Sequence, residues 1–525
     1  MRSRPVRGCG PVLPLALWIG TGLLTGCAPT IPPPPETAQV TVPAHWRHDA
    51  PDPQRAGPGA AQSAAQGAAQ SPAPTAPQGT AQGAAQPTSQ SMLASTPPGS
   101  SQDSSQGTSQ GTSPGATLVA PWWKVFGDPV LDALVDRALA HNSDLLLAGA
   151  RLEEARATLS ASRATEYPTL NLQVPFQATR TLQSTGVSDS RVIQPALAAS
   201  WELDLWGRNR DLTRAAALRL QASEADQRGA ALSVSATTVQ SYVALLALDA
   251  QLALSRATLV SRQEALRLAE DQARVGYISQ LQLTQAQAEY ASVAQTIPQQ
   301  ELAIRRQEHA LALLTGDTAR DQPRGLAFDQ LSLPAPPALV PSALLERRPD
   351  IVQAARQLAA TDATLAARQS AFLPQVSLSA SAGRLYVNAL DYDPIRVWSI
   401  GASALAPIFD AGRLRSQFDI AAAQRDQAAF TYRSRVLTAL SEVENALAGL
   451  DRLAEQQRFA LQRRDVLARS LQYAHDRYEA GYAGYLEELD AQRNLFAQDN
   501  ELIRIQQTAL ENRIALIRAL GGPLP

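Results

Sequence analysis

The chain has 525 residues, of which 45% are hydrophobic, and a formal net charge of −2 from 46 Lys and Arg against 48 Asp and Glu. This balance gives no support to nucleic-acid binding, which requires a basic surface. The only cysteines, Cys9 and Cys27, lie close to the N-terminus. Because Cys9 falls within the export signal described next, no disulfide is expected within one mature chain, and stability must come from packing and assembly.

The first 26 residues are organised like a bacterial export signal. Three arginines precede an apolar stretch at about 12–24, which is too short for a permanent membrane span of about 20 residues. The segment Leu24–Cys27 resembles a lipobox, in which the cysteine thiol is lipidated and becomes the mature N-terminus. We therefore predict a signal peptide over 1–26 and a covalent lipid on Cys27, with no other cofactor. Ala28 favours onward transport to the outer membrane, by resemblance to bacterial lipoproteins.

A lipid-anchored segment over 27–49 is predicted to lead into a low-complexity linker over 50–117. The linker consists mostly of Ala, Gln, Ser, Gly, Pro and Thr. Such a composition cannot bury enough apolar surface to offset the entropy of ordering it. We expect a flexible tether between the lipid anchor and the body of the protein.

The rest of the chain contains two copies of one unit. The pattern of 144–172 recurs 206 positions later at 350–378, as from Asp144 to Asp350. After a slip of one residue, Gly276 recurs as Gly481. A fixed period of this kind indicates tandem structural repeats. We place the first repeat, the connection and the second repeat at 118–316, 317–340 and 341–522.

Each repeat contains two segments in which apolar and polar residues alternate. A period of two indicates strands with one apolar face. In the first repeat the segments lie at about 170–179 and 197–205, joined by a turn near 184–190. In the second repeat they lie at about 376–382 and 398–404.

These strands have the length needed to cross a membrane as a tilted barrel, about ten residues. A sheet exposed to lipid must close so that no backbone edge is left unpaired, and four strands cannot close around a pore. Three chains would together give a twelve-stranded barrel, which is within the range of known membrane barrels. The alternative is a soluble sandwich packed on its apolar face.

Long helical segments follow the strands. A helix of some 65 residues spans about 100 Å, which exceeds any ordinary globular core. The return helices are half as long, so we expect each to stack end to end with a helix that precedes the strands, as with 143–167. Pro298 should bend or interrupt the first return helix. The two long helices and their return helices are predicted at 207–274, 280–314, 414–480 and 485–520.

The predicted fold class is therefore mainly α with a membrane β-barrel. It consists of two tandem repeats, each with two strands and a long antiparallel helical hairpin. Leucines at heptad-like spacing in 207–274 suit helices that pack on two sides. We expect the helices to form the wall of a hollow cylinder that extends from the barrel into the periplasm.

Four motifs carry a resemblance to a known family: Trp122–Pro129, Trp201–Gly207, Arg347–Ile351 and Pro407–Gly412. They resemble the TolC-like outer-membrane efflux factors, and lipidation places the chain nearer the OprM and NodT lipoprotein branch. The similarity covers about 122–522, with a weaker match near 41–47. It implies a homotrimer in the outer membrane, with a twelve-stranded barrel above an α-helical periplasmic tunnel. It also implies that an RND-type inner-membrane pump supplies substrate through a periplasmic adaptor.

The hairpin tips lie at 274–279 and 478–484, and each contains a glycine that permits a tight reversal between antiparallel helices. The resemblance implies that these tips contact the adaptor. The residues assigned to that contact are Val275, Gly276, Tyr277, Gly481 and Tyr482.

A candidate gate follows the second tip. Spacings of four and three place Leu486, Asp490 and Arg493 on one helical face, with Glu487 nearby. The resemblance implies that Leu486 and Asp490 form the narrowest constriction, that Arg493 joins the neighbouring contacts and that Tyr478 helps to tie the tip shut. A trimer would then carry an acidic ring that attracts cations. The alternative is a solvated face with weak local ion pairs.

The preferred function is a passive exit duct of a tripartite efflux pump. The outer-membrane channel of a type I protein-secretion system would have nearly the same signature, and a non-conducting coiled-coil structural lipoprotein is a third possibility. No nucleophile, phosphate-binding loop or metal-ligand grouping stands out among the residues. We therefore predict that the protein is not an enzyme.

Overall fold

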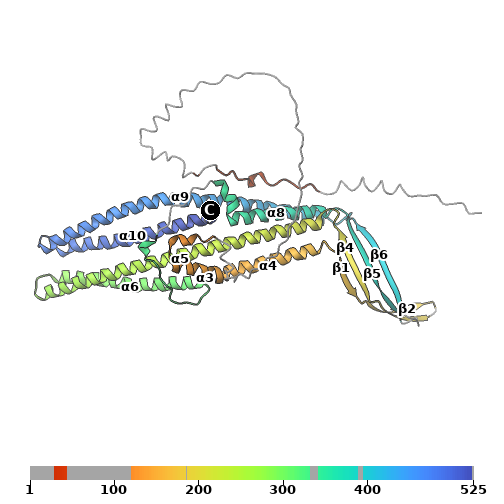
Figure 1. Cartoon of the computed structure of the whole chain (residues 1–525), viewed down its shortest axis with the longest axis horizontal. Helices are drawn as coiled ribbons and strands as arrows, with labels where there is room; N and C mark the ends of the chain where they lie inside the picture. The colour runs from red at the N-terminus through yellow and green to blue at the C-terminus, as the bar shows by residue number, and fades with distance from the viewer. Residues whose placement is uncertain are drawn as a thin grey trace, which may run out of the picture.

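The structure is a computed structural model that describes residues 29–43, 46, 120–184, 186–331, 341–387 and 394–522. The predicted signal peptide, the lipidation site Cys27 and the linker over 50–117 lie outside these residues. The described chain is elongated, with helices along the long axis and strands gathered at one end (Figure 1). The ends of the two helical hairpins lie at the opposite end of the molecule.

The first repeat begins with three helices and continues through strands into a long hairpin. Its helices before the strands are η3 (Trp122–Phe126), α3 (Pro129–His141) and α4 (Ser143–Ala164). Its strands are β1 (Thr169–Gln173), β2 (Phe176–Gln183), β3 (Gly186–Ile193) and β4 (Ala196–Leu203). Its hairpin consists of α5 (Arg208–Arg274) and α6 (Gln280–Leu314).

The second repeat has the same order of elements. Short helices connect it to the first repeat: η4 (Phe328–Gln330), η5 (Pro341–Ala343) and α7 (Leu344–Arg347). The helix before the strands is α8 (Pro349–Ser370), and the strands are β5 (Gln375–Val387) and β6 (Ile395–Leu405). The hairpin consists of α9 (Arg413–Glu479) and α10 (Tyr485–Ala519).

The predicted helix lengths and the end-to-end stacking are confirmed. Helices α5 and α9 each have 67 residues, and α6 and α10 each have 35. The Asn142 side-chain amide donates a hydrogen bond to the Leu314 carbonyl at 3.0 Å, which joins the start of α4 to the end of α6. Arg348 donates to the Ala519 carbonyl at 3.0 Å and so joins α8 to α10. Two shorter helices therefore lie alongside each long one.

Of the two effects expected at Pro298, the interruption is wrong, since α6 runs through this residue without a break, and the bend stays a prediction. Proline removes one backbone hydrogen bond and crowds the preceding turn, at a cost of about 3 kcal/mol. Helix α6 packs against α5 along its length. The burial of that shared face outweighs a single local defect, so the helix continues.

The strands form an antiparallel sheet in the order β1–β4–β5–β6, and β2 and β3 extend it as a hairpin beyond β1 and β4. The register brings the predicted apolar positions onto one face. Leu378 pairs with Trp201 on one side and with Ala402 on the other. Ser379 lies between Ser200 and Gly401 on the opposite face. The alternation read from the sequence is thus confirmed across the sheet.

In the first repeat the first predicted strand is divided in two, the second corresponds to β4, and a further strand, β3, takes up most of the predicted turn. Strands β1 and β2 are separated near Pro175, and β3 and β4 near Pro195, because proline has no N–H to donate to the ladder. The residues predicted as a turn near 184–190 mostly belong to β3, which begins at Gly186. The reversal is therefore tight, and the strand is longer than the alternating pattern showed.

The main hydrophobic core lies at the middle of the helical region, where α3, α5, α6 and the end of α10 meet. Helix α5 contains an apolar stretch long enough to span a membrane by composition alone. Residues from Ala231 to Leu252 supply much of this core, and we therefore assign the stretch to packing between helices. Trp123 and Tyr242 are among the largest fully buried side chains.

The N-terminal residues 29–43 lie against the outside of α8 and α9 (Figure 1). Arg425 of α9 is 1% exposed and donates to the carbonyls of Pro32 and Pro33. Gln369, near the end of α8, donates to the Pro29 carbonyl at 2.9 Å. The first described residue is thus held near the junction of helices and strands.

Candidate functional site

Each hairpin tip contains a glycine with a left-handed backbone conformation at the equivalent position. Gly276 has a φ of 75° and Gly481 a φ of 73°, a region in which a Cβ is strained. The following residue closes the turn in each case: Tyr277 N–H donates to the Gln272 carbonyl at 2.8 Å, and Tyr482 N–H donates to the Arg477 carbonyl at 2.8 Å. This is a helix C-cap that reverses the chain within a few residues.

The apolar side chains at the tips face solvent. Val275 is 78% exposed, and Tyr277 and Tyr482 are each 81% exposed. Large apolar groups at this exposure are typical of a surface that contacts a partner. The assignment of these residues to the adaptor stays a prediction.

The predicted gate residues share one exposed face of α10, as their spacing indicated. Leu486 is 50% exposed, whereas Leu489, less than one turn further along, is fully buried. The Asp490 side chain is 58% exposed and lies 3.4 Å from Arg493. The single chain therefore presents a leucine and a carboxylate outward at the start of α10, next to the tip.

Arg493 joins the two hairpins through an ion pair with Glu289. Its Nε donates to Glu289 Oε1 at 2.9 Å, and its Nη2 donates to the same oxygen. Glu289 belongs to α6 and is 8% exposed, so the bond joins α6 to α10 at the level of the predicted gate. The Glu289 carboxylate is buried while the Arg493 side chain is 49% exposed, and a charge-assisted bond to a buried carboxylate is stronger than an ion pair between two exposed side chains. Glu487 instead pairs with Arg477 of α9 at 2.8 Å.

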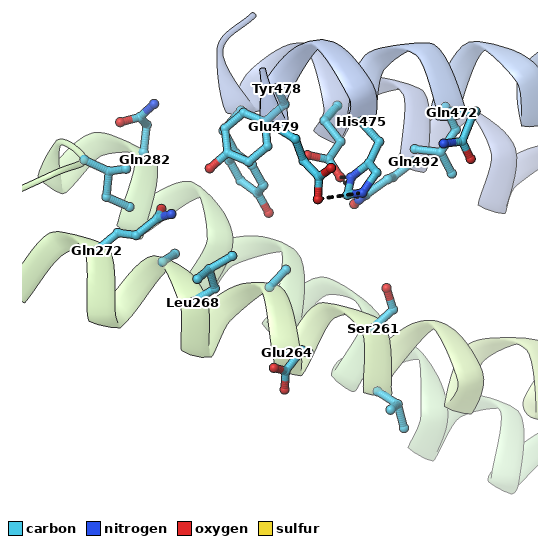
Figure 2. A pocket seen from close by; sticks show the side chains of 17 residues that line it. Ser261, Glu264, Leu268, Gln272, Gln282, Gln472, His475, Tyr478, Glu479 and Gln492 are labelled. Atoms are coloured by element: carbon cyan, nitrogen blue, oxygen red, sulfur yellow. Dashed lines mark hydrogen bonds and ion pairs between the residues drawn. The ribbon is translucent and has the colours of Figure 1, made fainter. Parts of the chain in front are cut away.

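A cavity of about 620 Å³ separates the hairpins near their tips. Figure 2 shows its lining side chains from both hairpins, with His475 bonded to two glutamates on one wall. His475 Nδ1 lies 3.0 Å from Glu488 of α10, and Nε2 lies 3.3 Å from Glu479 of α9. The hydrogen bond to Glu488 raises the pKa of His475.

Tyr478, predicted to tie the tip, packs on Tyr485 with ring centroids 5.8 Å apart. Burial is the main cause that raises the pKa of both hydroxyls. A hydrogen bond with Gln272 of α5 partly opposes the shift for Tyr478, so this side chain does connect the two hairpins. Tyr485 and Leu489 form a small apolar cluster with Ala269 and Ala286 of the first hairpin.

Sequence reasoning missed five residues of this site: Arg262, Glu289, His475, Tyr485 and Glu488. One signal was available, because Glu289 and Arg493 lie 204 positions apart, close to the repeat period. Equivalent positions of two repeats that pack side by side lie at the same height. The other residues had no signal, because their importance depends on burial between hairpins.

The fold and the site together define a class of protein. Within the described residues, a narrow sheet whose two edge strands have no outer neighbour stands at one end, and the tips of hairpins about 100 Å long lie at the other, close to the residues of the predicted gate. No cluster of three or more His, Cys, Asp or Glu suited to a metal ion occurs among the described residues. This is the architecture of an envelope-spanning channel subunit.

The chain belongs to the outer membrane efflux protein family, whose model matches residues 134–317 and 340–522. Outer membrane protein OpmQ of Pseudomonas aeruginosa, named for pyoverdine export, is 33% identical over 417 residues, covering 78% of this chain and 88% of the relative. Outer membrane protein SrpC of a Pseudomonas putida solvent efflux pump is 35% identical over 419 residues, with the same coverages of 78% and 88%.

The solved structure of the Campylobacter jejuni CmeC outer membrane channel is similar throughout the described body. It superposes with a TM-score of 0.72 at 26% identity and covers 76% of this chain and 87% of CmeC. The protein is thus an efflux channel component of the outer membrane, built from tandem repeats with a helical tunnel and a barrel wall. Its relatives are channel proteins of efflux systems rather than enzymes.

Proposed function

We propose that this chain assembles as a homotrimer into a passive exit duct, which receives small molecules from an RND-type inner-membrane pump through a periplasmic adaptor. The sheet is the observation that carries the proposal. Within the described residues, β1 and β6 are edge strands without a neighbour on their outer sides. Their backbone groups must be paired inside a membrane, and identical sheets that join edge to edge supply the pairs.

The exposure of the strands agrees with a wall that has lipid on one side and water on the other. Trp398 is 77% exposed and Ile400 is 79% exposed, which would be costly in water but is favourable against lipid. Serines 379, 381 and 399 lie on the opposite face. Three copies of this sheet give twelve strands, a size within the range of membrane barrels.

The gate of the duct is formed by Leu486, Glu487 and Asp490, tied by Arg493 and Tyr478. Three-fold symmetry places the exposed Asp490 carboxylates around the axis, where they attract cations and repel one another. Leu486 adds an apolar collar. The adaptor docks on the tips through Val275, Gly276, Tyr277, Gly481 and Tyr482.

A lipid on Cys27 anchors the chain to the inner face of the outer membrane. Gln369 holds Pro29 near the base of the strands, and two further residues span only about 7 Å. The anchor and the barrel then meet the membrane at the same level. The relatives are named for unlike cargoes, pyoverdine and solvent, which supports a duct that leaves the choice of cargo to the pump.

Single-channel conductance in planar lipid bilayers tests the duct and its gate. We expect low, cation-selective conductance from the wild-type protein and a large increase from the double variant Leu486→Ala/Asp490→Ala. The matched control is Leu461→Ala/Asp465→Ala, which removes a half-exposed leucine and an exposed aspartate at the same spacing on α9. If the folded, trimeric wild type and gate variant both fail to conduct, the duct is wrong, and the helices form a spacer.

A further inference from the structure

Arg262 of α5 is a buried cation that lies beside the gate and has no ion pair in the described part of the chain. Its side chain is 4% exposed, and its Nε has no hydrogen-bond partner. A guanidinium stays charged at any physiological pH. A buried charge without a partner destabilises the folded protein. Its presence suggests that Arg262 has a partner in another conformation.

Two carboxylates, Glu289 and Glu488, lie near Arg262, and each is already bound to another side chain. Burial lowers the pKa of Arg262, and Glu289 and then Glu488 are the anions that oppose this shift. Glu289 is bound to Arg493, and Glu488 is bound to His475 and Gln492. Arg262 and Glu289 belong to the first hairpin, whereas Arg493 belongs to the second. One carboxylate therefore stands between a cation of each hairpin.

We propose that Arg262 is the second partner of Glu289, and that opening of the gate transfers Glu289 from Arg493 to Arg262. The inference rests on the proposed gate at the start of α10. When the second hairpin moves away from the first, the tie between α6 and α10 breaks, but Glu289 stays next to α5 within its own hairpin. Opening then exchanges one ion pair for another, and the Glu289 carboxylate has a cationic partner in both states.

Arg493 also keeps a partner after the exchange. Its Nη1 lies 3.4 Å from Asp490 on the same helix, so these two residues move together. In the present state, the charges of Arg262 and Arg493 act against each other. Separation of the hairpins relieves this repulsion. The side chains of Arg262, Glu289, Asp490 and Arg493 therefore have two arrangements in which both carboxylates are paired. Arg262 makes the second arrangement possible.

The space around Arg262 permits such a movement. A cavity of about 290 Å³ borders Arg262 and lies between α5 and the second hairpin. The larger cavity of about 620 Å³ lies closer to the tips. The hairpins are therefore joined here by the Arg493 tie, the bond between Tyr478 and Gln272 and one small apolar cluster rather than by a continuous core. The second hairpin can shift without the loss of much packing.

The test is the open probability of the purified full-length protein in planar lipid bilayers. Arg493→Met should raise it about tenfold, because the closed state loses its tie. Arg262→Met should lower the open probability about tenfold. In the open state Glu289 would have no ion-pair partner, whereas the closed state would be relieved of a buried, unpaired charge. Arg267→Met on the same helix is the matched control, since this exposed arginine pairs only with its neighbours Glu264 and Asp271.

The double variant separates exchange from a merely structural role. Without Arg493, Glu289 can bind Arg262 in both states, so Arg262→Met should leave the open probability of the Arg493→Met variant almost unchanged. An equal reduction in both backgrounds overturns the exchange, and so does an Arg262→Met variant that matches the Arg267→Met control. Methionine retains most of the stem volume, and thermal melts confirm that each variant is folded.

The gate variant Leu486→Ala/Asp490→Ala distinguishes a failure of the ion-pair exchange from a failure of the proposed duct. If it conducts more than the wild type while Arg262→Met changes nothing, the gate stands and only the exchange is wrong. If neither the gate variant nor Arg493→Met conducts, the proposed duct itself is wrong.

Discussion

The middle of the helical region and the hairpin ends are built from the same helices but are held together differently. The middle has a continuous apolar core with fully buried Trp123, Tyr242 and Leu245. The ends have two cavities, one four-residue buried apolar cluster and ties between charged side chains. Apolar packing does not depend on direction, whereas an ion pair is lost when its partners separate. The middle is thus suited to rigidity and the ends to two states.

A buried hydrogen-bonded group, which we call the polar knot, also stabilises the middle and consists of Asp128, Tyr242 and the backbone N–H of Leu326. Asp128 is fully buried and caps α3 by accepting from Val130 N–H at 2.9 Å. Its other oxygen accepts from the Tyr242 hydroxyl at 2.8 Å and from Leu326 N–H at 3.0 Å. Burial and then this bond raise the pKa of Tyr242, so the hydroxyl stays protonated. The knot joins α3, α5 and the connection between the repeats.

The largest predicted effect is therefore in the middle. Asp128→Ala removes a helix cap, leaves the Tyr242 hydroxyl without an acceptor for its proton and leaves the Leu326 N–H without a partner, which should cost about 2–4 kcal/mol. The midpoint of thermal unfolding should fall by several degrees. Asp136→Ala, an exposed aspartate on the same helix, is the control and should change stability by less than about 0.5 kcal/mol. Equal melting of the two variants would show that the knot is dispensable.

The contrast also explains what the sequence could predict. Helix lengths, the apolar face of the sheet and the exposed face of Leu486 and Asp490 follow from local periodicity, which each segment carries within itself. The division between β1 and β2 at Pro175 was missed because the alternation of side chains continues across it, and β3, which ends before Pro195, was missed because most of its residues were assigned to a turn. The prolines themselves were the available signal, since proline cannot donate to a strand ladder.

The ties between hairpins could not be read from local pattern. Arg262 and Glu289 look like ordinary polar residues of an amphipathic helix, and only the packing of the second hairpin buries them. The partner of Arg493 was within reach, because the repeat period places residue 289 beside it. Sequence reasoning assigned Arg493 to the neighbouring contacts of the gate, and the structure identifies the carboxylate that it binds.

The second prediction concerns the apolar cluster at the ends. Leu489→Ala removes a fully buried side chain from the contact between hairpins and should cost about 2–3 kcal/mol. Because the cluster is separate from the main core, the loss should appear as local opening. Hydrogen exchange near the tips should accelerate at least tenfold, while the thermal midpoint changes little. Leu281→Ala, 67% exposed, is the control. A large drop in the thermal midpoint for Leu489→Ala would mean that the ends and the middle unfold together.

The smallest predicted effect is a dependence of the hairpin ends on pH. Bonds to Glu488 and Glu479 raise the pKa of His475 above the ordinary histidine value of 6.5. The charged form is therefore favoured in the folded protein, and its stabilisation is complete below about pH 6.5 and is lost as the pH rises through the raised pKa. The side chain is 46% exposed, so solvent screening limits the effect to less than about 1 kcal/mol.

Hydrogen exchange at the start of α10 should therefore be slowest, relative to its intrinsic rate, in mildly acid solution and should accelerate toward alkaline pH. His475 faces Glu488 across the hairpin and Glu479 on its own helix, and the cavity wall opposite contributes Glu264 of α5. Glu264 is bound to Arg267, so it competes little for the imidazolium. His475→Gln should remove the pH dependence while the exchange at the middle of α5 stays as in the wild type. A pH dependence that persists in His475→Gln would assign it to another group, and the ends would then owe their acid stability to the carboxylates around the gate.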